Sequence, residues 1–177
     1  QIPVDKVKKK ISSRTKAIII NNGGNPTGVL YSRAVLEELV ALVQAKNILL
    51  ISDEVYSGLT YEGAYVSAAA LGASKENIVV IQSCSKHFGM TGWRVGFVFA
   101  EASFVQMLSK IQGQSTTGTA SISQWAALGA FQNALEVLAY VKNAAQKRRD
   151  VFIGALNKIF GATLPAPAAG LYSFIPL

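Results

Sequence analysis

Three short aliphatic runs, each followed at once by a polar cluster, constrain the fold of this chain more than any other feature. The runs cover residues 17–20, 48–51 and 78–82. Each is short and rich in aliphatic, mostly β-branched residues, which is typical of buried strands. The polar clusters that follow would lie just past the strand ends, where open α/β sheets bind ligands.

The segments between these runs predict a mostly parallel sheet with flanking helices. Ser32 is a typical N-cap, and apolar residues recur at helical spacing from Val35 until about Asn47. A short helix is also expected at residues 68–71. Alternation of strand and connection in this order is the pattern of an α/β fold. A fourth strand candidate, residues 94–100, follows a short loop and should therefore run antiparallel, although the argument leaves its sheet neighbours open.

Helical patterns also occupy both ends of the chain. Val4, Val7 and Ile11 recur at helical spacing, so the lysines between them are expected on a solvated face rather than on nucleic acid. Toward the C-terminus, residues 122–131 and 134–160 are helical, and the second stretch is long enough to cross a domain boundary.

Composition and the number of cysteines argue against several classes of protein. The chain has 177 residues, of which 50% are hydrophobic and 15% charged, and its net charge is +7. No apolar run approaches the roughly 18 residues of a membrane span, and the N-terminus lacks a signal-peptide layout. Cys84 is the only cysteine, which excludes an internal disulfide and a multi-cysteine metal site. We therefore expect a cytoplasmic protein without a metal centre.

Lys86 is the strongest candidate for a catalytic group. It follows the third aliphatic run, between Ser83, Ser85 and the downstream Arg94. A lysine that loses hydration at a strand end becomes a better nucleophile, because the neutral amine is favoured. Hydroxyls and an arginine fork are groups that hold phosphate. An amine beside a phosphate clamp suggests pyridoxal phosphate. The only histidine, His87, is interpreted as structural.

The stretch at residues 83–96 resembles the cofactor attachment signature of class I/II, fold-type-I aminotransferases. Two further motifs occur in the family's order: residues 21–28 resemble its Asn-Pro-Thr-Gly turn, and residues 52–56 resemble its Asp-Glu-x-Tyr segment. Residues 110–116 resemble the bacterial aspartate aminotransferase subgroup. The resemblance implies the fold of the pyridoxal-phosphate-dependent transferases and transfer of an amino group between an amino acid, such as aspartate, and a 2-oxo acid.

The resemblance also assigns roles to individual residues. Lys86 would form a Schiff base with the cofactor aldehyde and act as the base in proton transfer. Asp53 would keep the pyridine nitrogen protonated. Tyr56 and Asn25 would hydrogen-bond the phenolic oxygen. The phosphate would be anchored by Ser83 and by a buried Arg94, and Ser85 is a further candidate. Side chains alternate across an extended segment, so Ser83 and Ser85 would share a face.

The resemblance places this chain within a longer enzyme. Residues 1–140 would belong to the large cofactor domain, and residues 141–177 would hold the interdomain helix and the start of a small α+β domain, with its first strand at 170–176. The family's N-terminal phosphate loop and substrate-carboxylate arginine are not found in this sequence. The isolated chain is therefore expected to be inactive.

Several alternatives stay open at this point. A lyase or decarboxylase of the same fold would use the same lysine and aspartate, and some transcription regulators carry an aminotransferase-like domain. The family implies a homodimer. The amino acid specificity, the oligomeric state and the choice between amino transfer and other pyridoxal phosphate chemistry are not encoded in these motifs.

Overall fold

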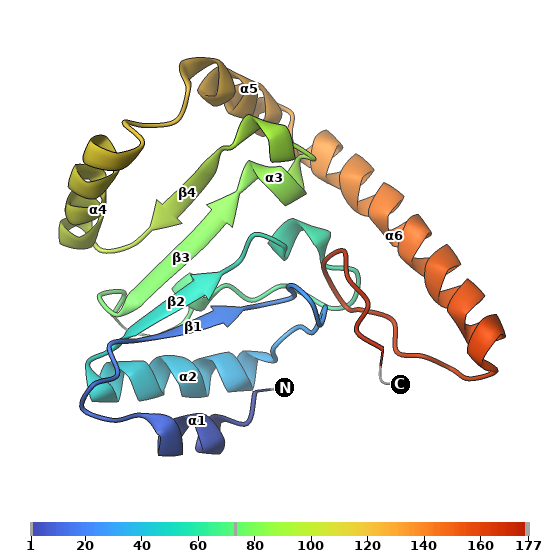
Figure 1. Ribbon diagram of the computed structural model, residues 1–177, viewed down its shortest axis with the longest axis horizontal. Helices are drawn as coiled ribbons and strands as arrows, with labels where there is room; N and C mark the ends of the chain where they lie inside the picture. Colours follow the sequence, from blue (N-terminus) through green and yellow to red (C-terminus); the bar gives the residue numbers. More distant parts are fainter. Residues whose placement is uncertain (1, 73, 176–177) are drawn as a thin grey trace.

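The computed structural model of this protein describes residues 2–72 and 74–175. Within this part of the chain one sheet is formed, and its strands follow chain order (Figure 1). The strands are β1 (Ala17–Asn21), β2 (Leu49–Asp53), β3 (Ile78–Ser83) and β4 (Gly96–Phe99). The three expected strands pair in parallel, and β4 runs antiparallel to β3. The sheet neighbour of β4, which the sequence left open, is therefore β3. The expected α/β class with a mostly parallel sheet is confirmed.

The strand register brings the three polar clusters to one edge of the sheet. Asn21 at the end of β1 is level with Asp53 on β2, and Asp53 is level with Ile81 on β3. Because β1, β2 and β3 point the same way, the segments that follow them emerge side by side (Figure 1). This edge is where the candidate site is assembled.

Helix α2 (Arg33–Lys46) covers one face of the sheet, and the short helix α1 (Val4–Lys10) packs against α2 (Figure 1). The backbone N–H of Val35 donates to the Ser32 side chain, and α2 ends at Asn47, both as expected. Asn47 itself adopts a left-handed conformation. The apolar face of α2 packs into the main core with β1, β2 and β3, and it includes Leu36, Leu39 and Val43 at zero exposure. Burial of this face, rather than helical propensity alone, holds α2 on the sheet.

Short helices follow β2 and β3 and shape the loops near the site. They are η1 (Ser57–Leu59), η2 (Ala68–Ala70), α3 (Cys84–His87) and η3 (Thr91–Trp93). The expected short helix at residues 68–71 corresponds to η2. In α3, Cys84 is buried in a second apolar cluster that also contains Phe88 and Ala127. This cluster attaches α3 to the helices that follow.

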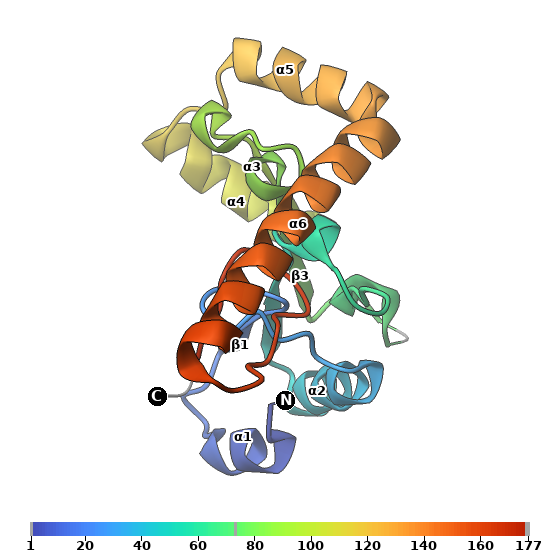
Figure 2. The same cartoon turned by 90° about the vertical axis from the view of Figure 1, so that its right-hand side faces the viewer.

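The C-terminal part is helical, with α4 (Ala102–Ser115), α5 (Ser121–Gln132) and α6 (Ala134–Phe160). The second and third were expected from the sequence, whereas α4 was missed. Helix α6 runs diagonally past the strand ends, and the chain then turns back toward the sheet (Figures 1 and 2). Among the described helices none is long and apolar enough to cross a membrane.

The expected strand at residues 170–176 is not formed in its described part, residues 170–175, and Pro176 lies outside the described residues. Among the described residues, the strand-like pairing of this region is one isolated antiparallel bridge, between Thr60 and Ala169. A strand needs a continuous ladder of backbone partners. The segment instead makes isolated hydrogen bonds to two different loops.

Candidate active site

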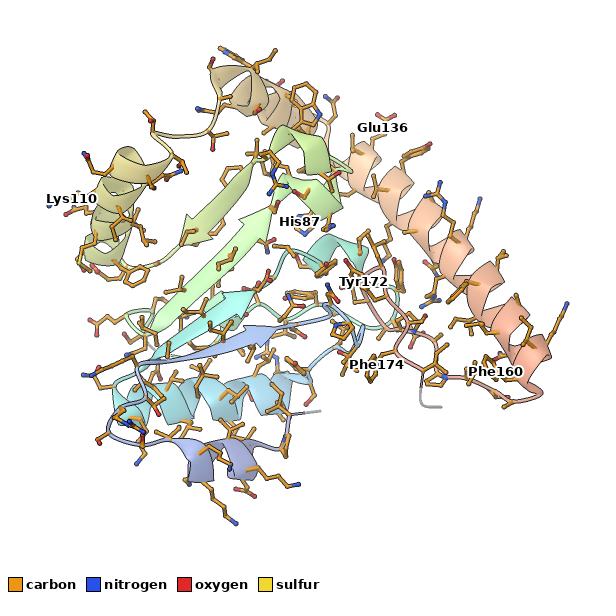
Figure 3. All side chains as sticks on the ribbon, viewed as in Figure 1. His87, Lys110, Glu136, Phe160, Tyr172 and Phe174 are labelled. Atoms are coloured by element: carbon orange, nitrogen blue, oxygen red, sulfur yellow. The ribbon has the colours of Figure 1, made fainter. Side chains whose placement is uncertain are left out.

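The candidate site forms where the segments after β1, β2 and β3 meet. Asn25 lies in the turn after β1, Asp53 ends β2 with Tyr56 just beyond it, and Lys86 lies in α3 directly after β3. Tyr172 comes from the segment after α6 and lies close to this edge (Figure 3). The parallel order of the strands is therefore what gathers the three motifs.

Helix α3 presents Lys86, and Ser83 begins it. The Ser83 hydroxyl accepts a hydrogen bond from the Ser85 backbone N–H at 3.0 Å and donates to the Val95 backbone oxygen at 3.0 Å. The expectation that residues 83–85 are extended was wrong, because Ser83 caps a helical turn. Cys84 and Phe88 anchor this turn in the second apolar cluster, so Lys86 is held from both sides.

Tyr56 lies beside Lys86 and is almost completely buried. The Lys86 Nζ lies 6.0 Å from the centre of the Tyr56 ring. The Tyr56 hydroxyl donates to the Tyr172 hydroxyl at 3.3 Å. Burial first, and then the Tyr172 hydroxyl and the charge of Asp53, raise the pKa of Tyr56 above that of an ordinary tyrosine. Tyr56 is therefore a neutral hydrogen-bond donor at physiological pH.

Asp53 is fixed by the turn that it starts. Its Oδ1 accepts from the Val55 backbone N–H at 3.3 Å, and its backbone oxygen accepts from the Asn22 N–H at 3.2 Å. The side chain is half-buried at the end of β2. This arrangement leaves the carboxylate at the sheet edge with Tyr56 as a neighbour.

Asn25 lies at the exposed tip of the turn after β1. The turn is held by hydrogen bonds from the Gly23 N–H to the Val29 oxygen and from the Gly28 N–H to the Gly24 oxygen. In the described part of the chain no hydrogen bond joins the Asn25 and Tyr56 side chains. The structure thus places Asn25 at the same edge without joining the two expected partners of the phenolic oxygen.

Arg94 shares a cavity of about 260 Å³ with Ser83 and Ser85. The three expected phosphate ligands are therefore brought together on the β3–β4 side of the site. Arg94 itself was expected to be buried, and it is exposed, with a left-handed backbone (φ 56°) and its Nη1 donating to the Thr91 oxygen at 3.1 Å. Arg94 is the C-cap of η3, in the turn that leads to β4.

His87 joins α3 to η1. Its Nε2 accepts from the Gly58 backbone N–H at 3.1 Å and contacts the Ser57 Oγ at 3.0 Å. Burial lowers the pKa of His87, so the neutral ring is favoured, and the bond from the Gly58 N–H requires an unprotonated Nε2. These contacts fit the structural interpretation of His87.

Sequence reasoning missed two polar side chains behind the site. The buried Glu54 accepts from the Ser52 hydroxyl at 3.0 Å and the Ala68 N–H at 2.8 Å, and burial raises its pKa despite these bonds. Tyr172 was missed because 116 residues separate it from Tyr56. The buried position of Glu54 could have been suspected from strand alternation, since Ser52 and Glu54 share a face, but no signal marked Tyr172.

Comparison with known proteins decides the family. The sequence family described as "Aminotransferase class I and II" matches residues 1–177. The chain belongs to this family. The chain is 35% identical to the aspartate aminotransferase of Geobacillus stearothermophilus over 176 residues, which is 98% of this chain and 45% of that protein. It is 33% identical to the aspartate/prephenate aminotransferase of Thermus thermophilus, covering 95% of this chain and 44% of the relative.

Solved aminotransferase structures confirm the fold. The crystal structure of aspartate aminotransferase from Thermotoga maritima superposes with a TM-score of 0.90 at 35% identity, over 100% of this chain and 46% of that one. An aromatic aminotransferase from Pyrococcus horikoshii matches with a TM-score of 0.88 at 31% identity, over 96% of this chain and 46% of that one. The chain thus spans less than half the length of the relatives it matches.

The family uses pyridoxal phosphate, and the residues present fit this group. The cavity beside β3 combines two hydroxyls with a guanidinium, a donor set that suits a phosphate. An amine, a carboxylate and a buried phenol lie at the adjoining strand ends. These groups match the polar positions of a substituted pyridine aldehyde that carries a phosphate.

Proposed function

We propose that the protein carrying this chain transfers an amino group between an amino acid and a 2-oxo acid, with pyridoxal phosphate as cofactor. The observation that carries the proposal is the meeting of Lys86, Asp53 and Tyr56 at the ends of the neighbouring parallel strands β2 and β3 in a chain of the aminotransferase family. Aspartate is the amino acid that the relatives' names favour.

The proposed mechanism gives each residue one task. Bound pyridoxal phosphate supplies an aldehyde that reacts with amines and a ring that accepts electrons. The Lys86 Nζ would tether the cofactor and move the proton that leaves the substrate α-carbon. The Asp53 carboxylate would hold a proton on the pyridine nitrogen, because a negative neighbour favours the charged form of that nitrogen.

The remaining residues would bind and orient. Tyr56 and Asn25 would donate hydrogen bonds to the phenolic oxygen, which Tyr56 can do because its proton is retained at physiological pH. Ser83, Ser85 and Arg94 would hold the phosphate in the cavity that they line. Arg94 would turn from the exposed Thr91 oxygen toward the phosphate, a stronger acceptor because it is charged.

Two further properties are part of the proposal. A homodimer is supported by the family resemblance, and a cytoplasmic location is compatible with the single, buried cysteine, Cys84. A division into a large domain at residues 1–140 and a second unit from residue 141 is supported by α6, whose first turns pack near α3 and η1 while its later turns extend past the sheet. The relatives reported above are named aminotransferases, so the lyase, decarboxylase and regulator alternatives are not favoured.

Borohydride reduction of the cofactor-loaded protein tests the proposal. We expect a pyridoxyl label on Lys86 in the peptide map and no label on Lys110, an exposed lysine on α4. Amino acid added to the loaded protein should then yield pyridoxamine phosphate and the matching 2-oxo acid. A label absent from Lys86, or release of carbon dioxide in place of amino transfer, would contradict the proposal.

A further inference from the structure

The segment after α6 is attached to both loops that carry the proposed ligands of the cofactor's phenolic oxygen. We call residues 166–172 the clasp. The Tyr61 N–H donates to the Ala168 oxygen at 2.8 Å, and the Gly170 N–H donates to the Leu59 oxygen at 3.0 Å, which ties the clasp to the loop beyond Tyr56. The Ala169 N–H donates to the Gly28 oxygen at 3.1 Å, which ties it to the turn that holds Asn25.

Glycines permit this close approach. At Gly28 (φ 62°) an added Cβ would lie 2.5 Å from the Pro167 Cβ, and at Gly170 (φ 77°) it would lie 2.6 Å from the Gly23 oxygen. Any larger residue would push the clasp away and would also be strained at these backbone angles. The clasp is thus seated on the turn by atomic contact as well as by hydrogen bonds.

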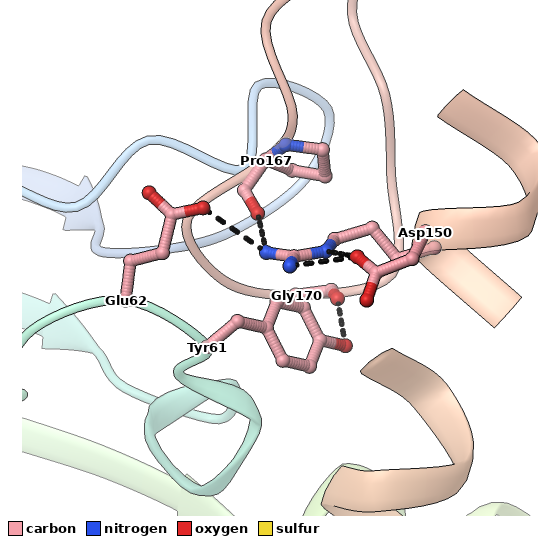
Figure 4. Close-up of polar contacts among 6 residues, drawn as sticks. Tyr61, Glu62, Asp150, Pro167 and Gly170 are labelled. Atoms are coloured by element: carbon pink, nitrogen blue, oxygen red, sulfur yellow. Dashed lines mark hydrogen bonds and ion pairs between the residues drawn. The ribbon is translucent and has the colours of Figure 1, made fainter. Parts of the chain in front are cut away.

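Arg149 on α6 secures the clasp from the other side (Figure 4). Its side chain is 12% exposed, and it donates to the Pro167 oxygen at 3.0 Å and pairs with Asp150 at 2.8 Å and Glu62 at 3.3 Å. The guanidinium lies 4.7 Å from the centre of the Tyr61 ring, and the Tyr61 hydroxyl donates to the Gly170 oxygen at 2.7 Å.

These contacts bring Tyr172 onto Tyr56. The two rings meet edge to face with centres 5.9 Å apart, and the hydroxyls are 3.3 Å apart. This is longer than the usual 2.7–2.8 Å of a hydroxyl pair, so the bond is weak and the Tyr56 proton can be given to a better acceptor. A hydroxyl can both donate and accept, and Tyr172 can therefore reverse the bond and donate to the Tyr56 oxygen.

We propose that Tyr172 is a positioning residue that orients the Tyr56 hydroxyl and, by donating to it, strengthens its bond to the cofactor's phenolic oxygen. Chains of hydrogen bonds strengthen one another in this way. The groups that face Tyr56 are Lys86, Asp53 and Tyr172, and Tyr172 is the only one of these on the clasp. The inference rests on the proposed function, because the phenolic oxygen is supplied by pyridoxal phosphate.

The substitution Tyr172→Phe tests the inference, since it keeps the ring contact and removes only the hydroxyl. The matched control is Tyr140→Phe, an exposed tyrosine on α6. In the full-length protein without cofactor, NMR of isotope-labelled tyrosine rings should show the Tyr56 ring signal shifted in Tyr172→Phe, because the Tyr56 hydroxyl loses its partner, and unchanged in Tyr140→Phe. The Tyr56 signal is assigned by its loss in Tyr56→Phe.

With pyridoxal phosphate bound, the pH midpoint of the cofactor's visible absorbance should rise in Tyr172→Phe by roughly half a unit to one unit, in the direction of the larger change in Tyr56→Phe. An unchanged midpoint, or a fall, overturns the inference, because the hydroxyl would then be idle or a competitor for the Tyr56 proton. An unchanged Tyr56 ring signal in the cofactor-free protein overturns it as well.

The two proposals fail differently. If the unsubstituted protein takes up no pyridoxal phosphate, the proposed function falls and the positioning role falls with it, whatever the NMR shows. If the unsubstituted protein binds the cofactor and Lys86 is labelled by borohydride, but Tyr172→Phe behaves as Tyr140→Phe does, only the positioning role is refuted.

Discussion

The sheet half of the molecule and its helical half use their apolar residues differently. Helix α2 buries Leu36, Leu39 and Val43 against the strands, whereas in the described residues α4 buries none and α6 buries only Ile153. Large apolar side chains such as Met107 on α4 and Trp125 on α5 are 56% and 72% exposed. The same helical periodicity therefore leads to burial in one half and exposure in the other.

This difference shows that the candidate site depends on two separate apolar clusters, one in each half of the molecule. The strand ends that carry Asp53 and Tyr56 rest on the main core beneath α2. Lys86 rests on the smaller cluster between α3, α5 and α6, and Tyr172 is held by the clasp. Substitutions in the two halves should accordingly separate effects on stability from effects on the site.

The largest expected effect is loss of activity in Lys86→Ala, at the point where the two halves meet. Removing the amine takes away both the tether and the proton carrier, and amino transfer should fall by at least roughly 10²–10⁴-fold. Steady-state kinetics with saturating cofactor measures the loss. Lys110→Ala on the exposed helix α4 is the control, and a comparable loss there would show that charge rather than position matters.

Core truncation should next distinguish the two halves by stability. Leu50→Ala on β2 removes a side chain at zero exposure and should lower the free energy of unfolding by about 2–5 kcal/mol. Met107→Ala on α4 should change it by no more than about 0.5 kcal/mol. Urea denaturation of each variant gives both values. Equal losses would break the contrast between a packed sheet and exposed helices.

A smaller loss is expected at the clasp. Arg149→Met removes the bond to the Pro167 oxygen and the contact with Tyr61, and we expect a loss of about 1–3 kcal/mol in unfolding free energy. The ion pairs contribute little of this, because Glu62 and Asp150 are more than half exposed. Arg148→Met, the exposed neighbour, should be near neutral in the same denaturation experiment, and a matching loss there would argue against the clasp.

The smallest effect is a pH dependence from His87. Its folded pKa lies below the ordinary 6.5, so the unfolded chain binds a proton first and stability falls as the pH drops below that value. The replacement His87→Gln can still accept from the Gly58 N–H but does not titrate. The unfolding free energy of this variant, measured between about pH 5 and 8, should fall less on acidification than that of the unsubstituted chain. If the unfolding free energies of the variant and of the unsubstituted chain change equally with pH, His87 is not held in its neutral form by burial.

Local patterns were sufficient to predict the elements that bury a regular face. The strand ending at Asp53, the cap at Ser32 and the end of the helix near Asn47 all followed from spacing and residue type. Helix α4 escaped prediction because its apolar residues face outward and are interrupted by polar ones. The expected strand at residues 170–176 failed in its described part because strand formation depends on a partner, which sequence pattern does not supply.

The sequence by itself determined which chemical groups this protein can use, since Lys86, Asp53 and Tyr56 follow buried strands and strand order fixes the edge at which they emerge. Only the tertiary structure decided how these groups are held: Arg94 exposed, Ser83 as a helix cap, and Tyr172 placed on Tyr56 from a distant segment. The physical reason is the distance along the sequence over which each effect acts. Periodicity and capping act over a few residues, whereas the clasp is set by close packing between segments more than a hundred residues apart.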